Sequence, residues 1–250
     1  MVKPFRQLDG AFVRIHELQP EVIAGIEKGF QGFRLAGGKP QLVKGWNRPL
    51  GLDPNATPEF THTPGQVAFT PDGSKLIVTT KGNTSSIDVF AVKNGAVAQT
   101  PVVTSLPEAV PFAVAFDQAG NLLVAEAGPN AVASFKIAGN GALTPLGAAV
   151  PTGQEATCWI NHVGNAFFVS NAGSGSVSAF GVNGSSLTPL GNTTTSPGTV
   201  DTAVVGKFLY VQTGGEGVVD AFSVATGGKL TPLGKVTVPN AVGGEGIVAD

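Results

Sequence analysis

A unit of about 45 residues recurs along most of the chain, and this repeat restricts the possible fold more than any other feature. One copy, Pro111 to Gly147, contains four short segments that are either apolar throughout or apolar at every second residue. Turn signals rich in Gly, Asn and Asp separate these segments. The end of its third segment recurs at Phe90-Ala91-Val92, Phe135-Lys136-Ile137, Phe180-Gly181-Val182 and Phe222-Ser223-Val224. The tetrapeptide TPLG also occurs three times, at 144–147, 188–191 and 231–234. A four-stranded unit with this period is typical of a β-propeller blade.

The repeat therefore predicts an all-β protein, a β-propeller of four-stranded antiparallel blades. Four complete blades are expected at Pro64–Ser105, Pro111–Thr152, Ala156–Ser196 and Thr199–Pro239. The four recurring phenylalanines, Phe90, Phe135, Phe180 and Phe222, should occupy equivalent buried positions. Before the first blade, the Pro-rich connection Asn47–Thr63 has no periodicity, which predicts a mobile loop.

The two ends of the chain differ from the repeats. Residues 1–28 form a divergent segment, followed by a propeller domain over 29–250, and all four arginines lie in the first 50 residues. Ala11–Leu18 could be a strand, Pro20–Lys28 a short helix or a strand, and Gly32–Leu35 and Gln41–Lys44 two outer strands of a blade. The tail, Gly243–Asp250, is similar to the first strand of a further blade.

Pairing of this tail with the N-terminal strands would make a composite fifth blade and close a ring, which predicts a monomer. The alternative is an open arc, a fragment of a longer propeller, which would associate with itself through its ends.

Composition excludes several classes of function. The net charge of −2 and the absence of a basic run argue against nucleic acid as a partner, and no apolar run approaches the ~20 residues of a membrane helix. The three histidines show no metal-ligand spacing, and no nucleotide or cofactor motif occurs, so we expect neither metal nor cofactor. The start of the chain does not read as a signal peptide, although the sparse charge resembles that of exported propellers. The single cysteine, Cys158, leaves the compartment undetermined and is expected to be buried filler.

Several phrases resemble the lactonase-type propeller family, which includes 6-phosphogluconolactonases and carboxymuconate cycloisomerases. They are QVAFTPDGSKL at 66–76, LLVAEA at 122–127, FVSNAG at 168–173 and the LTPLG edges. The resemblance implies a seven-bladed parent, a small organic substrate in the central funnel, and a central His and Glu that move protons. It places these catalytic residues at His62 and Glu126. Members also hold an anionic substrate with arginines, and here no arginine follows Arg48.

Polar residues on or just after the first and second strands of a blade are the candidates for ligand binding, because these strands line the funnel. The expected substrate-binding residues are Gln66, Glu155, Asn171, Gln212, Glu216 and Glu245. Asn161, His162 and Asp201 are weaker candidates, and His162 is better explained by the hairpin turn that follows it.

Two functions remain open at this point. One is a lactonase-like or cycloisomerase-like enzyme that uses acid/base chemistry on a small organic molecule. The other is a non-catalytic propeller that serves as a binding or interaction scaffold.

Overall fold

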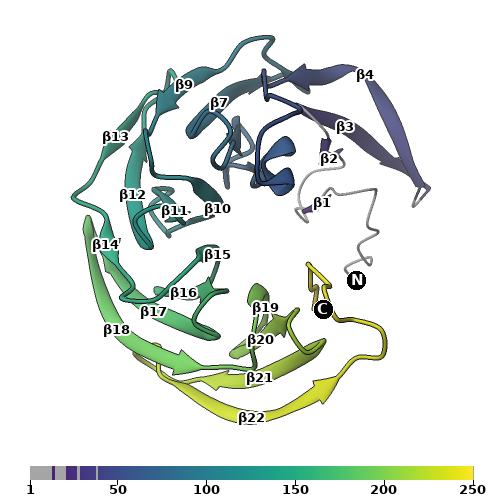
Figure 1. Cartoon of the computed structure of the whole chain (residues 1–250). Helices are drawn as coiled ribbons and strands as arrows, with labels where there is room; N and C mark the ends of the chain where they lie inside the picture. Colours follow the sequence, from purple (N-terminus) through teal and green to yellow (C-terminus); the bar gives the residue numbers. More distant parts are fainter. Residues whose placement is uncertain (1–12, 15–20, 27–28, 38, 250) are drawn as a thin grey trace. The chain divides into compact units, whose positions relative to one another are not determined.

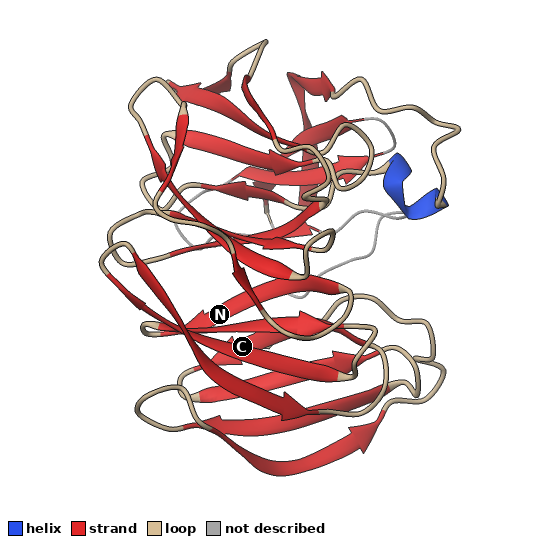
Figure 2. Ribbon diagram, turned by 60° about the vertical axis from the view of Figure 1, so that its left-hand side comes forward, coloured by secondary structure: helices blue, strands red, loops and turns tan. Residues whose placement is uncertain are grey.

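The computed structural model describes residues 13–14, 21–26, 29–37 and 39–249, which form five antiparallel sheets (Figure 1). Strands make up more than half of this part of the chain and turns and loops most of the rest, and its one helix is the short 3-10 turn η1 (Glu59–His62) (Figure 2). Among the described residues, no helix is long and apolar enough to cross a membrane. The chain divides into two compact units, residues 1–112 with 137–144 and residues 113–136 with 145–250, each described below by itself.

The first unit contains two sheets. The first has the order β1 (Val13–Arg14), β2 (Glu21–Ile26), β3 (Gly29–Ala36), β4 (Lys39–Pro49). The second has the order β5 (Val67–Phe69), β6 (Lys75–Thr79), β7 (Ser86–Lys93), β8 (Ala96–Val97), and β9 (Val102–Ser105) also pairs with β7. The segment 20–28, for which the sequence left helix and strand open, therefore contains a strand.

Three sheets lie wholly or mostly in the second unit. The third sheet has the order β10 (Pro111–Phe116), β11 (Leu122–Glu126), β12 (Ala131–Ile137), β13 (Leu143–Pro145), with β14 (Val150–Pro151) also on β12. The fourth has the order β15 (Thr157–Val163), β16 (Ala166–Asn171), β17 (Ser176–Asn183), β18 (Ser186–Thr194). The fifth has the order β19 (Thr199–Val205), β20 (Phe208–Thr213), β21 (Val218–Val224), β22 (Leu230–Thr237). The all-β architecture of four-stranded antiparallel blades and the four complete blades expected between residues 64 and 239 are confirmed.

The recurring phenylalanines occupy the same register position in four sheets. Phe90, Phe135, Phe180 and Phe222 lie opposite Leu76, Leu122, Phe167 and Leu209, respectively, on the second strand. All eight side chains are at most 3% exposed. The same large apolar pair lies at the end of each hairpin that is far from its turn. The prediction of equivalent buried positions is confirmed.

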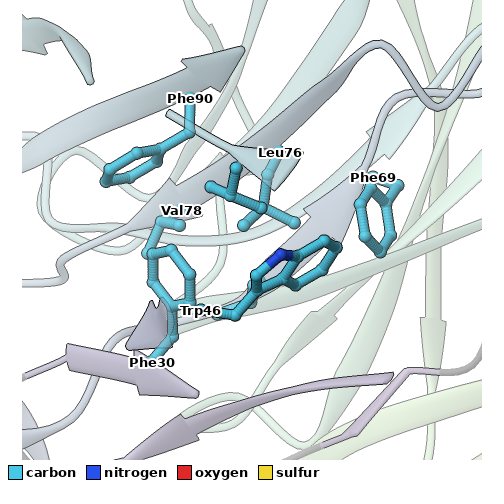
Figure 3. Close-up of a cluster of buried hydrophobic side chains, with 8 residues drawn as sticks. Phe30, Trp46, Phe69, Leu76, Val78 and Phe90 are labelled. Carbon is cyan, nitrogen blue, oxygen red and sulfur yellow. The ribbon is translucent and has the colours of Figure 1, made fainter. Parts of the chain in front are cut away.

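Within the first unit, a cluster of buried side chains joins the first two sheets (Figure 3). Phe30 on β3 meets Phe90 on β7 edge to face, with ring centroids 5.2 Å apart, and Trp46 on β4 lies near Phe69 on β5. The edge-to-face arrangement of Phe30 and Phe90 is a favourable geometry for aromatic pairs. The contact between the two sheets buries faces that a single sheet would leave in water.

Arg48, the last arginine of the chain, is a structural residue. Its guanidinium is buried and donates hydrogen bonds to the carbonyl oxygens of Gly45, Asn47, Val97 and Ala98 at 2.5–2.8 Å. Burial lowers the pKa of this guanidinium. These bonds tie β4 to the turn after β8 and occupy the donors that a substrate carboxylate would need.

The composite blade expected from the two ends of the chain is wrong. The first sheet is built from four N-terminal strands, and the tail from 238 to 249 contains no strand. Instead, two backbone N–H groups of the tail donate to side chains of the fifth sheet, from Gly246 to Gln212 Oε1 and from Ile247 to Asp201 Oδ2. The sequence predicted that these N–H groups would donate to backbone carbonyls of a partner strand. In the structure their acceptors are side-chain oxygen atoms. Residues 11–12, 15–20 and 250 lie outside the described residues.

Hydrogen bonds hold the Pro-rich connection, Asn47–Thr63, against the second sheet. Asn47–Pro49 belongs to β4, and beyond it the buried side chain of Asn83 contacts two points of the loop. Its amide donates to the carbonyl oxygens of Asp53 and Thr61, both at 3.0 Å, and its Oδ1 accepts the N–H of Asp53 at 3.1 Å. The mobility of this loop stays a prediction that hydrogen exchange can test. The three hydrogen bonds of Asn83 are expected to restrict its motion.

Replacing Asn83 by alanine is expected to free this loop and cost about 2 kcal/mol of stability, because it removes three hydrogen bonds of a buried side chain. Hydrogen exchange of the Asp53 amide should become much faster. Asn55→Ala, an exposed change in the same loop, is the control. Rapid exchange at Asp53 in the unaltered protein would contradict the anchoring.

Candidate functional site

In the second unit, β11 lies against β15 and β15 against β19, and the loops at one edge of the three sheets are linked to each other. We call this row the loop rim; it consists of residues 127–130, 152–157, 172–175, 195–198, 214–217 and 241–246. Hydrogen bonds connect each loop to the next, among them Thr157 N–H to Asn130 Oδ1, Gly173 N–H to Glu155 O and Thr195 N–H to Gly175 O.

The loops approach closely at two glycines. A Cβ on Gly198 would lie 2.6 Å from Gly215 N, and a Cβ on Gly215 would lie 2.7 Å from Pro197 O. Side chains are therefore excluded where these two loops meet, and the rim stays compact.

Glu126, a predicted catalytic residue, is the last residue of β11 and lies at the loop rim. Its side chain is only 5% exposed, and no described residue donates a hydrogen bond to its carboxyl. Burial raises the pKa of Glu126 to about 7, because the charged form loses its hydration and gains no compensating partner. A carboxyl that titrates near neutral pH is suited to general acid/base catalysis.

The repeat itself shows why this carboxyl lacks partners. Asn171 takes the same place in the fourth sheet, opposite Ser176, as Glu126 takes opposite Ala131 in the third. The Asn171 amide donates to Ser176 Oγ at 3.1 Å and Ser178 Oγ at 2.9 Å, and its Oδ1 accepts the hydroxyl of Thr157 at 2.8 Å.

In the third sheet, the positions of the two serines are occupied by Ala131 and Ala133. A carboxyl therefore faces methyl groups at the place where the neighbouring sheet supplies hydroxyls.

Asn171, a predicted substrate-binding residue, is fully buried and uses both polar atoms within its own sheet. These bonds favour a structural role. Gln212 is also buried, and its side chain holds the tail through Gly246.

Asp201 on β19 lies next to this contact and near Cys158. Its Oδ2 accepts Ile247 N–H at 3.1 Å and its Oδ1 accepts Thr202 N–H at 2.6 Å. The Cys158 thiol is buried 3.8 Å from the carbonyl oxygens of Ser170 and Val200. Its pKa is raised to about 12, first by burial and further by the negative charges of Asp201 and Glu245. A thiol held in this protonated state is a poor nucleophile. The expected burial of Cys158 is confirmed.

The other predicted residues of this unit are spread along the rim or lie away from it. Glu155, Glu216 and Glu245 are exposed members of three different rim loops. Asn161 donates to Thr202 O at 3.1 Å and accepts the N–H of His162. His162 stacks on Phe167 with ring centroids 5.0 Å apart, beside the turn at 164–165, in agreement with a role in the hairpin.

The remaining predicted residues belong to the first unit. His62 ends the helical turn η1, is half-buried, and its Nε2 lies 2.9 Å from Ala56 O. Gln66 is buried just before β5, where its backbone pairs with Thr79. The catalytic pair predicted from the sequence thus has one residue in each unit, and their cooperation stays a prediction.

Besides Arg48, the sequence analysis missed the buried charged residues Lys81, Asp88 and Asp220. Lys81 is 6% exposed, donates to Phe60 O and to Thr63 Oγ1, and lies over the rings of Phe60 and Phe112. Asp88 on β7 is 5% exposed and accepts the hydroxyl of Ser86 at 2.8 Å. Burial raises the pKa of Asp88, partly offset by that hydrogen bond. Asp88 and Asp220 occupy the same position, the third residue of the third strand of a blade. This shared position in the repeat could have indicated from the sequence that both aspartates have a structural role.

Among the residues that the structure describes, no three His, Cys, Asp or Glu side chains are grouped so that they could hold a metal ion. Of the carboxyl groups at the loop rim, that of Glu126 belongs to a side chain only 5% exposed and has no hydrogen-bond donor among the described residues.

Comparison with known proteins finds similarity in structure alone. No protein-family model and no curated protein sequence matches the chain. Among solved structures, a periplasmic gluconolactonase from Pseudomonas aeruginosa has a TM-score of 0.73 at 17% identity, over 95% of this chain and 74% of that one. A proposed 6-phosphogluconolactonase from Bacteroides fragilis has a TM-score of 0.74 at 18% identity, over 92% and 70%.

A virginiamycin B lyase from Staphylococcus aureus has a TM-score of 0.62 at 16% identity, over 93% of this chain and 72% of that one. At these identities the similarity concerns the fold. The resemblance to lactonase-type propellers, predicted from the sequence, is confirmed at that level.

Proposed function

We propose that this protein is a lactonase-like β-propeller enzyme that hydrolyses a small cyclic ester with Glu126 as the general acid/base. The observation that carries the proposal is the buried Glu126 carboxyl, which has no hydrogen-bond donor among the described residues. The fold shared with a gluconolactonase supports the choice of a lactone. Because fold alone does not determine activity, the side chain is the stronger argument. The proposal leaves cycloisomerisation aside, since none of the three proteins compared above is a cycloisomerase.

The chemistry needs one group that both accepts and returns a proton. The ionised Glu126 carboxylate would take a proton from water as the water oxygen attacks the carbonyl carbon of the ester. The resulting carboxylic acid would give that proton to the ring oxygen as the C–O bond breaks, which releases a hydroxy acid and restores the carboxylate. A pKa of about 7 keeps both forms populated at neutral pH.

Activity against a panel of simple lactones tests this function. Glu126→Gln is expected to lower kcat/KM by about 10²–10⁴-fold, the usual contribution of a general acid/base. In the unaltered protein, kcat/KM should rise with pH through about pH 7 as Glu126 ionises. Glu108→Gln removes an exposed carboxyl and should leave the rate unchanged.

Hydrolysis that survives Glu126→Gln would overturn the role of Glu126. His62→Gln, tested in the same assay, shows whether the residue predicted as its partner contributes to the rate.

A non-catalytic binding propeller is the second candidate, favoured by one specific observation. The Arg48 guanidinium donates to backbone carbonyls, and the sequence has no arginine after it, so the four blades after residue 64 have no arginine that could hold an anionic lactone. If purified protein hydrolyses none of the lactones and still binds a small molecule at the loop rim, the binding function replaces the enzymatic one.

A further inference from the structure

We propose that the loop rim of the second unit selects small molecules that carry a positive charge and rejects carboxylated or phosphorylated ones. The inference names the substrate class of the proposed enzyme and so rests on the proposed function. The sign of the electrostatic potential at the rim can be measured whether or not the protein has enzymatic activity.

The carboxyls of this unit are concentrated at the rim. Glu126 ends β11, Glu155 precedes β15, Glu216 follows β20, Asp201 lies near the start of β19, and Glu245 lies in the tail segment that the rim includes. The loops that bear them are linked to each other by the hydrogen bonds described above. Five carboxyls from five different segments therefore face one edge of three sheets.

The lysines of this unit lie at the opposite edge, with one exception. Strands alternate in direction, so the end of β12, the β19–β20 turn and the β21–β22 turn are all at the edge away from the rim. Lys136, Lys207 and Lys229 occupy these three places.

The exception is Lys235 on the outer strand β22, which lies opposite Asp220 in the register. Its amine donates to Ser196 Oγ at 3.3 Å, and Asp220 accepts from the same serine. This lysine is balanced by a carboxylate within its own sheet, so it does not neutralise the rim.

A row of exposed acidic residues by itself shows only a solvated surface. Here the row includes Glu126, whose side chain is 5% exposed and has no hydrogen-bond partner among the described residues. Among the described residues the fully buried unpaired side-chain atoms are Ser170 Oγ and Thr202 Oγ1, so the Glu126 carboxyl is still reached by solvent. A bound cation or hydrogen-bond donor could replace the hydration that this largely buried carboxyl has lost. The exposed carboxylates of the rim would attract such a ligand, and potentials of several kT from clustered charges raise local concentrations of opposite charge by 10-fold or more.

Paramagnetic probes test the sign of the charge directly. Backbone amide relaxation is measured with three nitroxides of the same ring: 4-amino-TEMPO as the cation, 4-carboxy-TEMPO as the anion and 4-hydroxy-TEMPO as the neutral reference. At about 10 mM salt, where the Debye length is about 30 Å, amides of the rim loops should relax about tenfold more with the cation than with the anion. At about 1 M salt the ratio should approach one, because the Debye length falls to about 3 Å.

Matched variants locate the effect. The double change Glu155→Gln and Glu216→Gln should reduce the ratio at the rim at least twofold. Asp117→Asn removes one charge at the opposite edge and should leave the ratio unchanged. Equal relaxation by the two charged probes at the rim, or a preference for the anion, overturns the proposal.

A series of lactones then separates this inference from the proposed function. Three γ-lactones are compared at low salt: one with an ammonium group, one uncharged and one with a carboxylate. The expected order of kcat/KM is cationic, neutral, anionic, with about tenfold between the extremes. The reverse order overturns the charge preference and leaves the lactonase function standing. Absence of hydrolysis for all three, together with the expected probe ratios, rejects the lactonase function and leaves the cation preference standing.

Discussion

Replacing Phe180 by alanine is expected to lower the free energy of unfolding by about 3–5 kcal/mol, the usual cost of removing a large aromatic side chain from a core. Phe180 is 1% exposed and lies opposite Phe167, which is fully buried. The cavity left behind cannot collapse easily, because β17 is held between β16 and β18 by antiparallel pairing. Urea unfolding of the purified variant measures the loss.

Phe60→Ala is the matched control for this experiment. The same side chain is removed at a position that is 52% exposed, so the cost should stay below about 1 kcal/mol. The equivalent changes at Phe90, Phe135 and Phe222 should each resemble Phe180→Ala. A melting temperature unchanged by Phe180→Ala would contradict the register on which the repeat is built.

Replacing Glu126 by glutamine is expected to stabilise the protein by about 3 kcal/mol at pH 8.5 and to change little at pH 4.5. The pKa of Glu126 is about 7 in the folded protein and close to the ordinary 4.5 when the chain is unfolded. Between these values the folded state binds more protons than the unfolded state, so stability falls as pH rises and the loss is complete above pH 7. The size follows from 1.36 kcal/mol for each unit of pKa difference, about 3 kcal/mol in all.

The measurement is urea unfolding of the two proteins across this pH range. Glu108→Gln changes an exposed carboxyl and should show no such divergence. Ala133→Ser supplies a hydroxyl at the position that Ser178 occupies in the next sheet, and it should lower the pKa of Glu126 and shrink the pH dependence. A difference between Glu126→Gln and the unaltered protein that is the same at both pH values would show that the carboxylate is well solvated.

The candidate site was only partly accessible from the sequence. Glu126 was predicted as a catalytic residue from the resemblance to lactonase-type propellers, and the sequence could not show that the structure buries it. The reason lies on a neighbouring strand, in Ala131 and Ala133, and becomes visible only when the register pairs them with Glu126 and Val124. Asn171 was predicted to bind substrate from its place at the end of a second strand. In the structure its side-chain amide is hydrogen-bonded to two serine hydroxyls, which favours a structural role.

The two ends of the chain show the limit of pattern reading. The tail was expected to be a strand because GGEGIVAD resembles the start of a blade, and the resemblance is one of local composition. Strand formation requires a partner backbone, and here the N–H groups of Gly246 and Ile247 are bound by Gln212 and Asp201. In the same way, Lys81 and Arg48 are ordinary cations in the sequence, and tertiary contacts bury both.

The sequence by itself determined the repeat, the strands within each blade and the buried phenylalanines, because hairpins form between neighbouring segments and a two-residue period settles which side chains are buried. The tertiary structure alone decided which polar groups are satisfied, where charges of one sign gather and what becomes of the tail. These properties depend on side chains that come together from different strands and sheets. A carboxyl at the end of a strand is an acid with an ordinary pKa in one such environment and a group titrating near neutral pH in another, and only the packing of the sheets distinguishes them.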